Sequence, residues 1–156
     1  NLEEKIEYLT APVSGKVIDL KKVNDQAFAK KNLGDGFAIK LNDNIIKSPC
    51  AGEIVQVFTT GHALGIKTES GLEILLHIGI NTVKLAGRGF TKLIKNGDKV
   101  KAGTPLIEVD LDYLKNNISS LATPVVISNM EIVKSIEVLR YGKVESGINV
   151  LKVELS

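Results

Sequence analysis

The sequence is poor in residues that several classes of protein depend on. Cys50 is the only cysteine, tryptophan is absent, aromatic residues make up 4% of the 156 positions, and arginine occurs only as Arg88 and Arg140. A single cysteine excludes an internal disulfide and fits a reducing compartment, where we expect Cys50 to be a small buried residue. Scattered lysines, without a basic stripe or an aromatic platform, argue against nucleic-acid binding.

Long apolar runs and a secretory leader are also lacking. Without a run near 18 apolar residues the sequence predicts no membrane-spanning segment, and we expect a soluble chain. The first residue is Asn1 rather than methionine, so we interpret residues 1–10 as a leader or linker end. Residues 11–156 are long enough to bury a core of their own, and we expect them to form a single domain.

Short β-branched runs between glycine and proline turns dominate the chain, as in residues 16–20, 54–58 and 106–109. This pattern predicts an all-β sandwich or barrel. Helical signals are weak: residues 110–117, with Asp110 as N-cap, and residues 26–31 each predict one very short helix.

A weak internal repeat suggests duplication. Residues 11–18 (APVSGKVI) are echoed by residues 48–55 (SPCAGEIV), and the two copies are followed by the similar phrases FAIK at 37–40 and LGIK at 64–67. Duplicated β motifs that face each other would build a sandwich without long exposed edges.

The chain has two histidines, His62 and His77, each within a short apolar segment. The connection between the segments reads as a tight turn at Ser70-Gly71, so the two segments predict a β-hairpin. A two-residue loop would pair residues whose numbers sum to 141 and place the histidines diagonally on one face, roughly 7–8 Å apart at the backbone. Gly79 would then lie opposite His62.

Leu64, Ile66 and Leu75 would share that face and give the histidines an apolar setting. A three-residue loop would reverse the parity and break the argument.

Two convergent imidazoles permit three kinds of chemistry besides a purely structural role. A metal site would need further ligands, for which Glu73 and Asp35 are candidates, but the chain has no HExxH motif and no cysteine pair. Acid–base hydrolysis would need a nucleophile, and the single thiol lies in a predicted turn. In a phosphoryl relay one histidine would attack phosphorus while the other donates a hydrogen bond to the phosphoryl oxygens. Thr60, two residues before His62, could fix the His62 tautomer.

Six motifs occur in a fixed order along the chain, and together they resemble the glucose-class enzyme IIA of the bacterial sugar phosphotransferase system. They are Gly34-Asp35-Gly36-Phe37-Ala38-Ile39, Thr60-Gly61-His62-Ala63, the segment EILLHIGINTV at 73–83, Gly87-Arg88-Gly89-Phe90, the segment GDKVKAG at 97–103, and the segment TPVVISN at 123–129. The resemblance runs from about Ala11 to the C-terminus.

This resemblance implies an antiparallel β-sandwich of the duplicated hybrid type. It implies that His77 takes a phosphoryl group on Nε2 from the histidine-containing phosphocarrier protein and passes it to a cysteine on the IIB domain of a sugar permease. His62 would stabilise the phosphoryl group, Thr60 would orient His62, and the Gly79 carbonyl would accept a hydrogen bond from His77. The expected location is the cytoplasm, with contact to the membrane only through a fused or docked permease.

The resemblance also implies a shallow apolar patch that docks the partner proteins. Our candidates for the partner-binding residues are Asp35, Phe37, Phe58, Leu75, Ile78 and Asn81. Two of these depart from the family pattern, which often has aspartate at the position of Asn81 and phenylalanine at that of Leu75. No cofactor is expected, and any zinc at His62 and His77 would be adventitious or regulatory. A metal-binding β domain that uses these two histidines is the alternative function.

Overall fold

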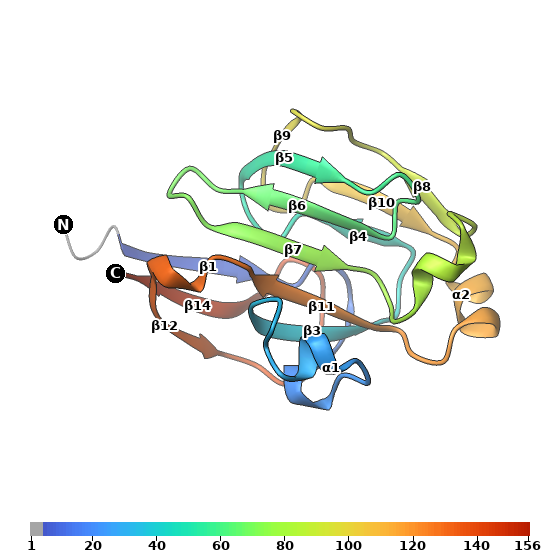
Figure 1. Ribbon diagram of the computed structural model, residues 1–156, viewed down its shortest axis with the longest axis horizontal. Coiled ribbons are helices and arrows are strands. Elements are labelled where there is room, and N and C mark those ends of the chain that lie inside the picture. Colours follow the sequence, from blue (N-terminus) through green and yellow to red (C-terminus); the bar gives the residue numbers. More distant parts are fainter. Residues whose placement is uncertain (1–4) are drawn as a thin grey trace.

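The chain folds into short antiparallel strands and two short helices, in a computed structural model that describes residues 5–156 (Figure 1). The strands are β1 (Ile6–Thr10), β2 (Gly15–Ile18), β3 (Asp35–Leu41), β4 (Ile45–Lys47), β5 (Gly52–Val57), β6 (Ala63–Lys67), β7 (Glu73–His77), β8 (Phe90–Lys92), β9 (Lys99–Val100), β10 (Pro105–Val109), β11 (Ala122–Ile127), β12 (Val133–Val138), β13 (Gly142–Val144) and β14 (Asn149–Leu155). The helices are α1 (Gln26–Ala29) and α2 (Leu111–Asn117), with 3₁₀ helices over Leu20–Lys22, Thr82–Leu85 and Met130–Ile132.

Within residues 5–156 the strands form one sheet of eight strands and two sheets of three. The large sheet has the order β13-β2-β3-β11-β7-β6-β5-β9, and the small sheets have the orders β1-β14-β12 and β4-β10-β8. In Figure 1, β3, β11, β7, β6 and β5 of the large sheet run side by side, and β1, β14 and β12 lie together at the left. This arrangement confirms the all-β, antiparallel class that the sequence predicts.

Alternation along the strands sends one face of the large sheet into the main core. In β3, Phe37, Ile39 and Leu41 point inward, and Val125 and Ile127 do the same from β11. They pack against side chains of both small sheets. Because a half-buried antiparallel strand alternates core and surface positions with period two, the opposite face of the large sheet is left to face outward.

A second, smaller apolar cluster covers part of this outer face. Phe28 of α1 and Leu20 of the first 3₁₀ helix pack with Ala38 of β3 and Val126 of β11, and Leu75 of β7 packs at the edge of the cluster. Figure 1 shows α1 beside β3. The short helix therefore forms a cap over the outer face next to β7, and β7 ends at His77.

Both short helices predicted from the sequence are confirmed. The side chain of Asp110 accepts a hydrogen bond from the Tyr113 amide, and that of Asp25 accepts one from the Ala27 amide. Each carboxylate satisfies a backbone donor that the first helical turn leaves free. No helix among residues 5–156 combines the length and the apolar character that crossing a bilayer requires.

The internal repeat is visible in the strand register. Lys16 of β2 pairs with Lys40 of β3, and Glu53, the residue that corresponds to Lys16 in the second copy, pairs with Lys67 of β6 in the same manner. The two copies therefore form equivalent hairpins within one sheet.

The structure corrects the expected start of the domain. Residues 6–10, which we interpreted as part of a leader or linker, form β1 and pair with β14, and Leu9 is buried in the main core. The alternating burial of this strand explains the difference, because a strand that pairs and buries a leucine contributes to the fold. Residues 1–4 of the same expectation lie outside the described residues.

Phe37 gives a direct test of this core. Its side chain is fully buried, so Phe37→Ala should lower the free energy of unfolding by about 3–5 kcal/mol, through lost burial and a cavity. Chemical denaturation measures the change. Phe58→Ala is the matched control and should cost far less, because the Phe58 side chain is already 38% exposed. Equal losses in the two variants would contradict the assignment of Phe37 to the core.

Candidate functional site

His77 is the last residue of β7, and its ring is held in one orientation by the turn that follows. Its Nδ1 lies 2.8 Å from the carbonyl oxygen of Gly79. A carbonyl can only accept, so Nδ1 must carry the proton and Nε2 of the neutral ring has a free electron pair. The imidazole is half-buried on the outer face of the sheet.

The Gly79 carbonyl is itself fixed. The Gly79 amide donates to Thr123 Oγ1 of β11 over 3.1 Å, and the backbone at Gly79 has φ +68°. A Cβ at this position would lie 2.8 Å from Thr82 and 2.9 Å from Ile118. Glycine is therefore required both by the left-handed backbone and by the close packing.

His62 approaches from the loop between β5 and β6. The loop is closed by a hydrogen bond from the Phe58 amide to the Ala63 carbonyl, and Gly61 turns the chain with φ +77°. His62 Nδ1 is hydrogen-bonded to Thr60 Oγ1, as the resemblance implies for orientation of the ring. The His62 carbonyl also accepts from the Ile78 amide over 2.7 Å, which ties the loop to the end of β7.

The two imidazoles meet edge to face. Their ring centroids are 5.1 Å apart, and the ring planes are inclined by 79°. The residues that the sequence analysis placed together are thus adjacent in space, and the rings do not point to opposite sides of the sheet.

The hairpin register that brings the two rings near each other differs from the predicted register. The β6–β7 connection is a three-residue loop, since Lys67 pairs with Glu73 and the Thr68 amide bonds to the Leu72 carbonyl. His77 therefore pairs with Ala63 rather than Leu64, and Gly79 does not lie opposite His62. The parity is reversed, as a three-residue loop requires. The rings still converge because His62 precedes β6 and lies in a bend, outside the alternation of the strand.

The reversed parity also moves the aliphatic neighbours. Leu64 and Ile66 face the main core and are fully buried, whereas Leu75 shares the outer face with His77. Of the three residues predicted to give the histidines an apolar setting, only Leu75 does so.

Aromatic rings form the walls of the site. Phe58 packs edge-on against His62 and Phe28 lies tilted against His77, each with ring centroids 5.3 Å apart. His62 is only 4% exposed, so solvent reaches the pair mainly from the side of His77.

Two residues at the site were missed from the sequence, Phe28 and Asp25. Phe28 lies on α1 and contacts His77, and the charge of its helix-capping neighbour Asp25 acts on the His77 ring. The only sequence signal was the short helix over residues 26–31. Nothing in that local pattern says which strand the helix covers.

Burial controls the charge state of both imidazoles. It lowers the pKa of His62 below the ordinary 6.5, and the positive charge of a protonated His77 lowers that pKa further. Burial also lowers the pKa of His77, against the hydrogen bond to Gly79 and the negative charge of Asp25, both of which raise it. Both rings are therefore neutral at neutral pH, so Nε2 of His77 is unprotonated there.

The predicted partner patch is brought to the site only in part. Phe58 and Leu75 lie beside the histidines, and Asn81 is exposed just beyond Gly79 with a left-handed backbone that asparagine tolerates. The prediction that Phe37 and Ile78 belong to the partner patch is wrong, because both side chains are fully buried and no partner can reach them.

Asp35 is not brought to the histidines, and its role in partner binding stays a prediction. It lies in β3 on the alternation that carries Phe37 inward and forms an ion pair with Lys31 at 3.3 Å. The carboxylate that acts on His77 is that of Asp25.

Within residues 5–156 the structure does not assemble the groups that a metal site or acid–base hydrolysis would need. Among residues 5–156 no three histidine, cysteine or carboxylate side chains come together in a way that could hold a metal ion. Cys50 is buried, as expected, and burial together with the charge of Glu7 raises its pKa to about 12, although the Ser48 hydroxyl opposes the shift. A thiol with this pKa stays protonated and is a poor nucleophile.

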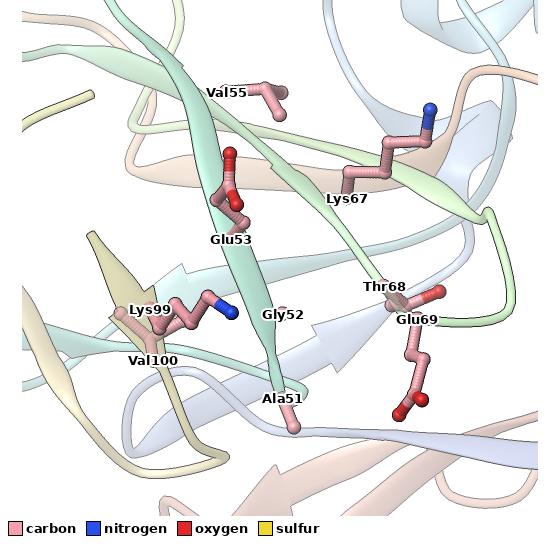
Figure 2. A pocket seen from close by; sticks show the side chains of 9 residues that line it. All are labelled: Ala51, Gly52, Glu53, Val55, Lys67, Thr68, Glu69, Lys99 and Val100. Carbon is pink, nitrogen blue, oxygen red and sulfur yellow. The ribbon is translucent and has the colours of Figure 1, made fainter. Parts of the chain in front are cut away.

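A hollow elsewhere on the large sheet is lined by neither histidine nor cysteine. It lies over β5, β6 and β9 and is lined by charged side chains that include Glu53, Lys67 and Lys99 (Figure 2). It lies at the ends of β6 and β7 away from the histidines, because Lys67 ends β6 whereas His62 precedes its first residue.

The fold and the site together define a class of protein. A rigid β scaffold presents one neutral imidazole with a free Nε2, supported by a second neutral imidazole and apolar walls. This arrangement suits a domain that carries a transferable group on histidine.

Comparison with known proteins gives the particular family. Residues 7–133 match the family model of the phosphoenolpyruvate-dependent sugar phosphotransferase system, EIIA 1. The chain belongs to this family, whose members are phosphoryl-transfer components of sugar uptake that carry phosphate on histidine.

Individual relatives agree with this assignment. The chain is 47% identical to a glucose-specific EIIA component of Borreliella burgdorferi, over 88% of this chain and 72% of that protein. It is 46% identical to an N-acetylglucosamine-specific EIICBA component of Klebsiella pneumoniae, over 91% of this chain but only 22% of that protein. The chain thus spans about a fifth of the length of this longer relative. A solved structure, the glucose permease IIA from Mycoplasma capricolum, is 39% identical with a TM-score of 0.90, and the match covers 95% of this chain and 96% of that one.

The electrostatic coupling at the site can be tested by NMR titration of the two rings. Both should titrate below 6.5. His77→Gln should raise the pKa of His62, because it removes the repelling charge, and Asp25→Asn should lower the pKa of His77, because it removes an attracting one. As a control, Asp35→Asn should leave both titrations unchanged. A rise in the His77 pKa on Asp25→Asn would contradict the described geometry.

Proposed function

We propose that His77 is the phosphoryl acceptor of this domain and that Nε2 is the atom that becomes phosphorylated. The observation that carries the proposal is the hydrogen bond from Nδ1 to the Gly79 carbonyl, because it selects the tautomer whose Nε2 electron pair is free. The lowered pKa of His77 keeps this pair unprotonated at neutral pH. Half-burial on the outer face leaves the ring within reach of a docked protein.

The transfer step breaks the N–P bond of a phosphohistidine on the donor and forms an N–P bond at His77 Nε2. The donor nitrogen keeps the electron pair of the broken bond, and His77 keeps its proton on Nδ1. The His77 ring gains positive charge as the new bond forms, and the Gly79 carbonyl stabilises that charge through the same hydrogen bond. Transfer to the next acceptor reverses these changes.

His62 acts as the stabiliser of the phosphoryl group in this proposal. A hydroxyl proton donated by Thr60 to His62 Nδ1 would leave the proton of the neutral ring on Nε2, where it can be donated to a phosphoryl oxygen. The 5.1 Å separation of the rings fits a group held between them. Phe58 and Phe28 exclude water that would otherwise hydrolyse the phosphoimidazole.

The proposed donor is the histidine-containing phosphocarrier protein, and the proposed acceptor is a cysteine of a IIB domain. The acceptor is supported by relatives named EIICBA components, in which a domain like this one is a part of a larger protein. The half-buried Leu75 and the exposed edge of Phe58 offer an apolar surface to both partners in turn. The relatives differ in sugar, so the proposal extends to the class of sugar permeases and to a location at the cytoplasmic side of the membrane.

The proposed step uses no cofactor, since both ends of the transfer are side chains. Zinc bound by His62 and His77 would compete with the phosphoryl group, because it needs the same Nε2 electron pair. Removal of metal by a chelator should therefore leave phosphorylation unchanged.

The assignment of roles is tested by phosphorylation with the phosphoenolpyruvate-driven donor proteins, followed by intact-mass spectrometry. The wild type should gain one acid-labile phosphoryl group and His77→Ala none. His62→Ala should still accept the group but pass it to a IIB domain about 10²-fold more slowly, the scale expected on loss of one transition-state donor. Normal onward transfer by His62→Ala would refute its helper role. Phosphorylation of His77→Ala would refute the acceptor.

The orienting role of Thr60 has its own test. Thr60→Val keeps the shape but removes the hydroxyl, and onward transfer should fall about tenfold, the effect of roughly one hydrogen bond. Thr60→Ser should restore it. Nitrogen-15 NMR should show a mixture of His62 tautomers in the valine variant only. An unchanged tautomer in Thr60→Val would show that the hydroxyl does not orient the ring.

A further inference from the structure

Three lysines form an unbroken row across one edge of the large sheet. Lys143 of β13 pairs directly with Lys16 of β2, and Lys16 pairs directly with Lys40 of β3. Directly paired residues of antiparallel strands project from the same face with Cβ atoms about 5 Å apart. We call Lys143, Lys16 and Lys40 the lysine row; all three side chains are exposed on the outer face.

Such a row weakens the fold unless something compensates it, because like charges directly opposite each other repel. Across residues 5–156, the ion pairs within 4 Å involve Lys31, Lys95 and Lys134 and none of the lysine row. The neighbouring positions on the same face are mostly uncharged, with Ser14 and Asn42 beside the row and Glu145 as the one acidic group lining the same hollow.

At the other edge of the large sheet, a corresponding row of paired residues alternates between lysine and glutamate. There Lys99 of β9 pairs with Glu53 of β5, Glu53 pairs with Lys67 of β6, and Lys67 pairs with Glu73 of β7. Charge alternates along this row, and Figure 2 shows Glu53 between Lys67 and Lys99. The internal repeat makes Glu53 the counterpart of Lys16. The lysine row and the row of alternating charge therefore differ by lysine or glutamate at this one corresponding position.

The surroundings of the lysine row match a lipid surface better than a protein. Tyr141 is exposed, immediately precedes β13 and lies two residues from Lys143. Tyr141 is 57% exposed and its neighbour Leu139 is 39% exposed. Protein interfaces need an apolar centre that excludes water, and the row is flanked by polar groups. A bilayer of anionic headgroups needs only exposed basic residues, with tyrosine at its interface.

We propose that the lysine row, with Tyr141, is a docking surface for the anionic headgroups of a phospholipid bilayer. This inference rests on the proposed function only in that a permease partner places the chain beside a membrane. The row would hold the domain at the membrane surface. Lys40 on β3, the member of the row nearest the site, lies two strand spacings from β7, roughly 10 Å, and α1 packs on the face between β3 and β7. The domain would therefore dock with the bilayer on the β13 side of α1 and leave His77 on its other side.

The test is co-sedimentation of the purified chain with vesicles of phosphatidylglycerol and phosphatidylcholine in equal parts, against phosphatidylcholine alone. The wild type should bind only the anionic vesicles, and high salt should release it. The triple variant Lys16→Gln, Lys40→Gln, Lys143→Gln should lose roughly a hundredfold in partition coefficient, since each lysine near an anionic surface contributes about fivefold.

A matched control removes equal charge from the opposite edge. Lys67→Gln, Lys99→Gln, Lys101→Gln also changes the net charge from +2 to −1, yet it should keep binding within about twofold of the wild type. Equal loss in the two triple variants would overturn the proposal, since only total charge would then matter. Failure of the wild type to prefer anionic vesicles would also overturn it.

Lys16→Glu separates the proposed role from a structural one. It recreates the alternating row, so it should raise the midpoint of thermal unfolding while weakening vesicle binding roughly thirtyfold. A lower midpoint would contradict the premise that the row is unfavourable for folding.

Phosphorylation in solution is the independent readout. The lysine-row variant should accept the phosphoryl group at the wild-type rate, so failure of the proposed function would appear in that assay and not on vesicles. Slower acceptance by the variant, with vesicle binding unchanged, would show an acidic protein partner instead and would overturn the proposal.

Discussion

The hydrogen bond from His77 Nδ1 to the Gly79 carbonyl is the contact on which the proposed chemistry of this domain depends. It selects one tautomer of a neutral ring and so decides which nitrogen is free to react. The carbonyl can serve only because Gly79 adopts a left-handed backbone and is anchored to Thr123 on β11. The atom that we propose as the phosphoryl acceptor is thus set by a turn whose conformation glycine alone accommodates at this packing density.

The two faces of the large sheet have separate tasks. The inner face supplies the core, and residues such as Phe37 and Leu76 are fully buried there. The outer face carries His77 under the partial cover of α1, where burial lowers the pKa of the ring without removing it from a partner's reach. The proposed role of His77 as acceptor needs both conditions, because a protonated nitrogen cannot attack phosphorus and a fully buried one cannot be approached by a partner.

The same outer face shows how duplication diverges. The equivalent hairpins β2–β3 and β5–β6 carry Lys16 and Glu53 at corresponding positions, so one edge has a single sign of charge and the other alternates. Packing does not require this difference, since both side chains are exposed. Charge on an exposed face is free to specialise, whereas the buried partners Val17 and Ile39 must remain apolar to keep the core.

The sequence by itself determined the all-β class and the two short helices with their aspartate caps, because turn residues, caps and alternation act over a few neighbouring positions. It also predicted that His62 and His77 meet, although they do so through a bend before β6 and not through strand alternation. It did not determine the hairpin register, since Ser70-Gly71 fits a loop of either two or three residues and one residue reverses every side chain. Only the tertiary structure decided that Phe37 and Ile78 are buried, that β1 belongs to the fold, and that Asp25 and Phe28 reach His77. These contacts join segments far apart in the chain, and no local pattern specifies which surface a short helix covers.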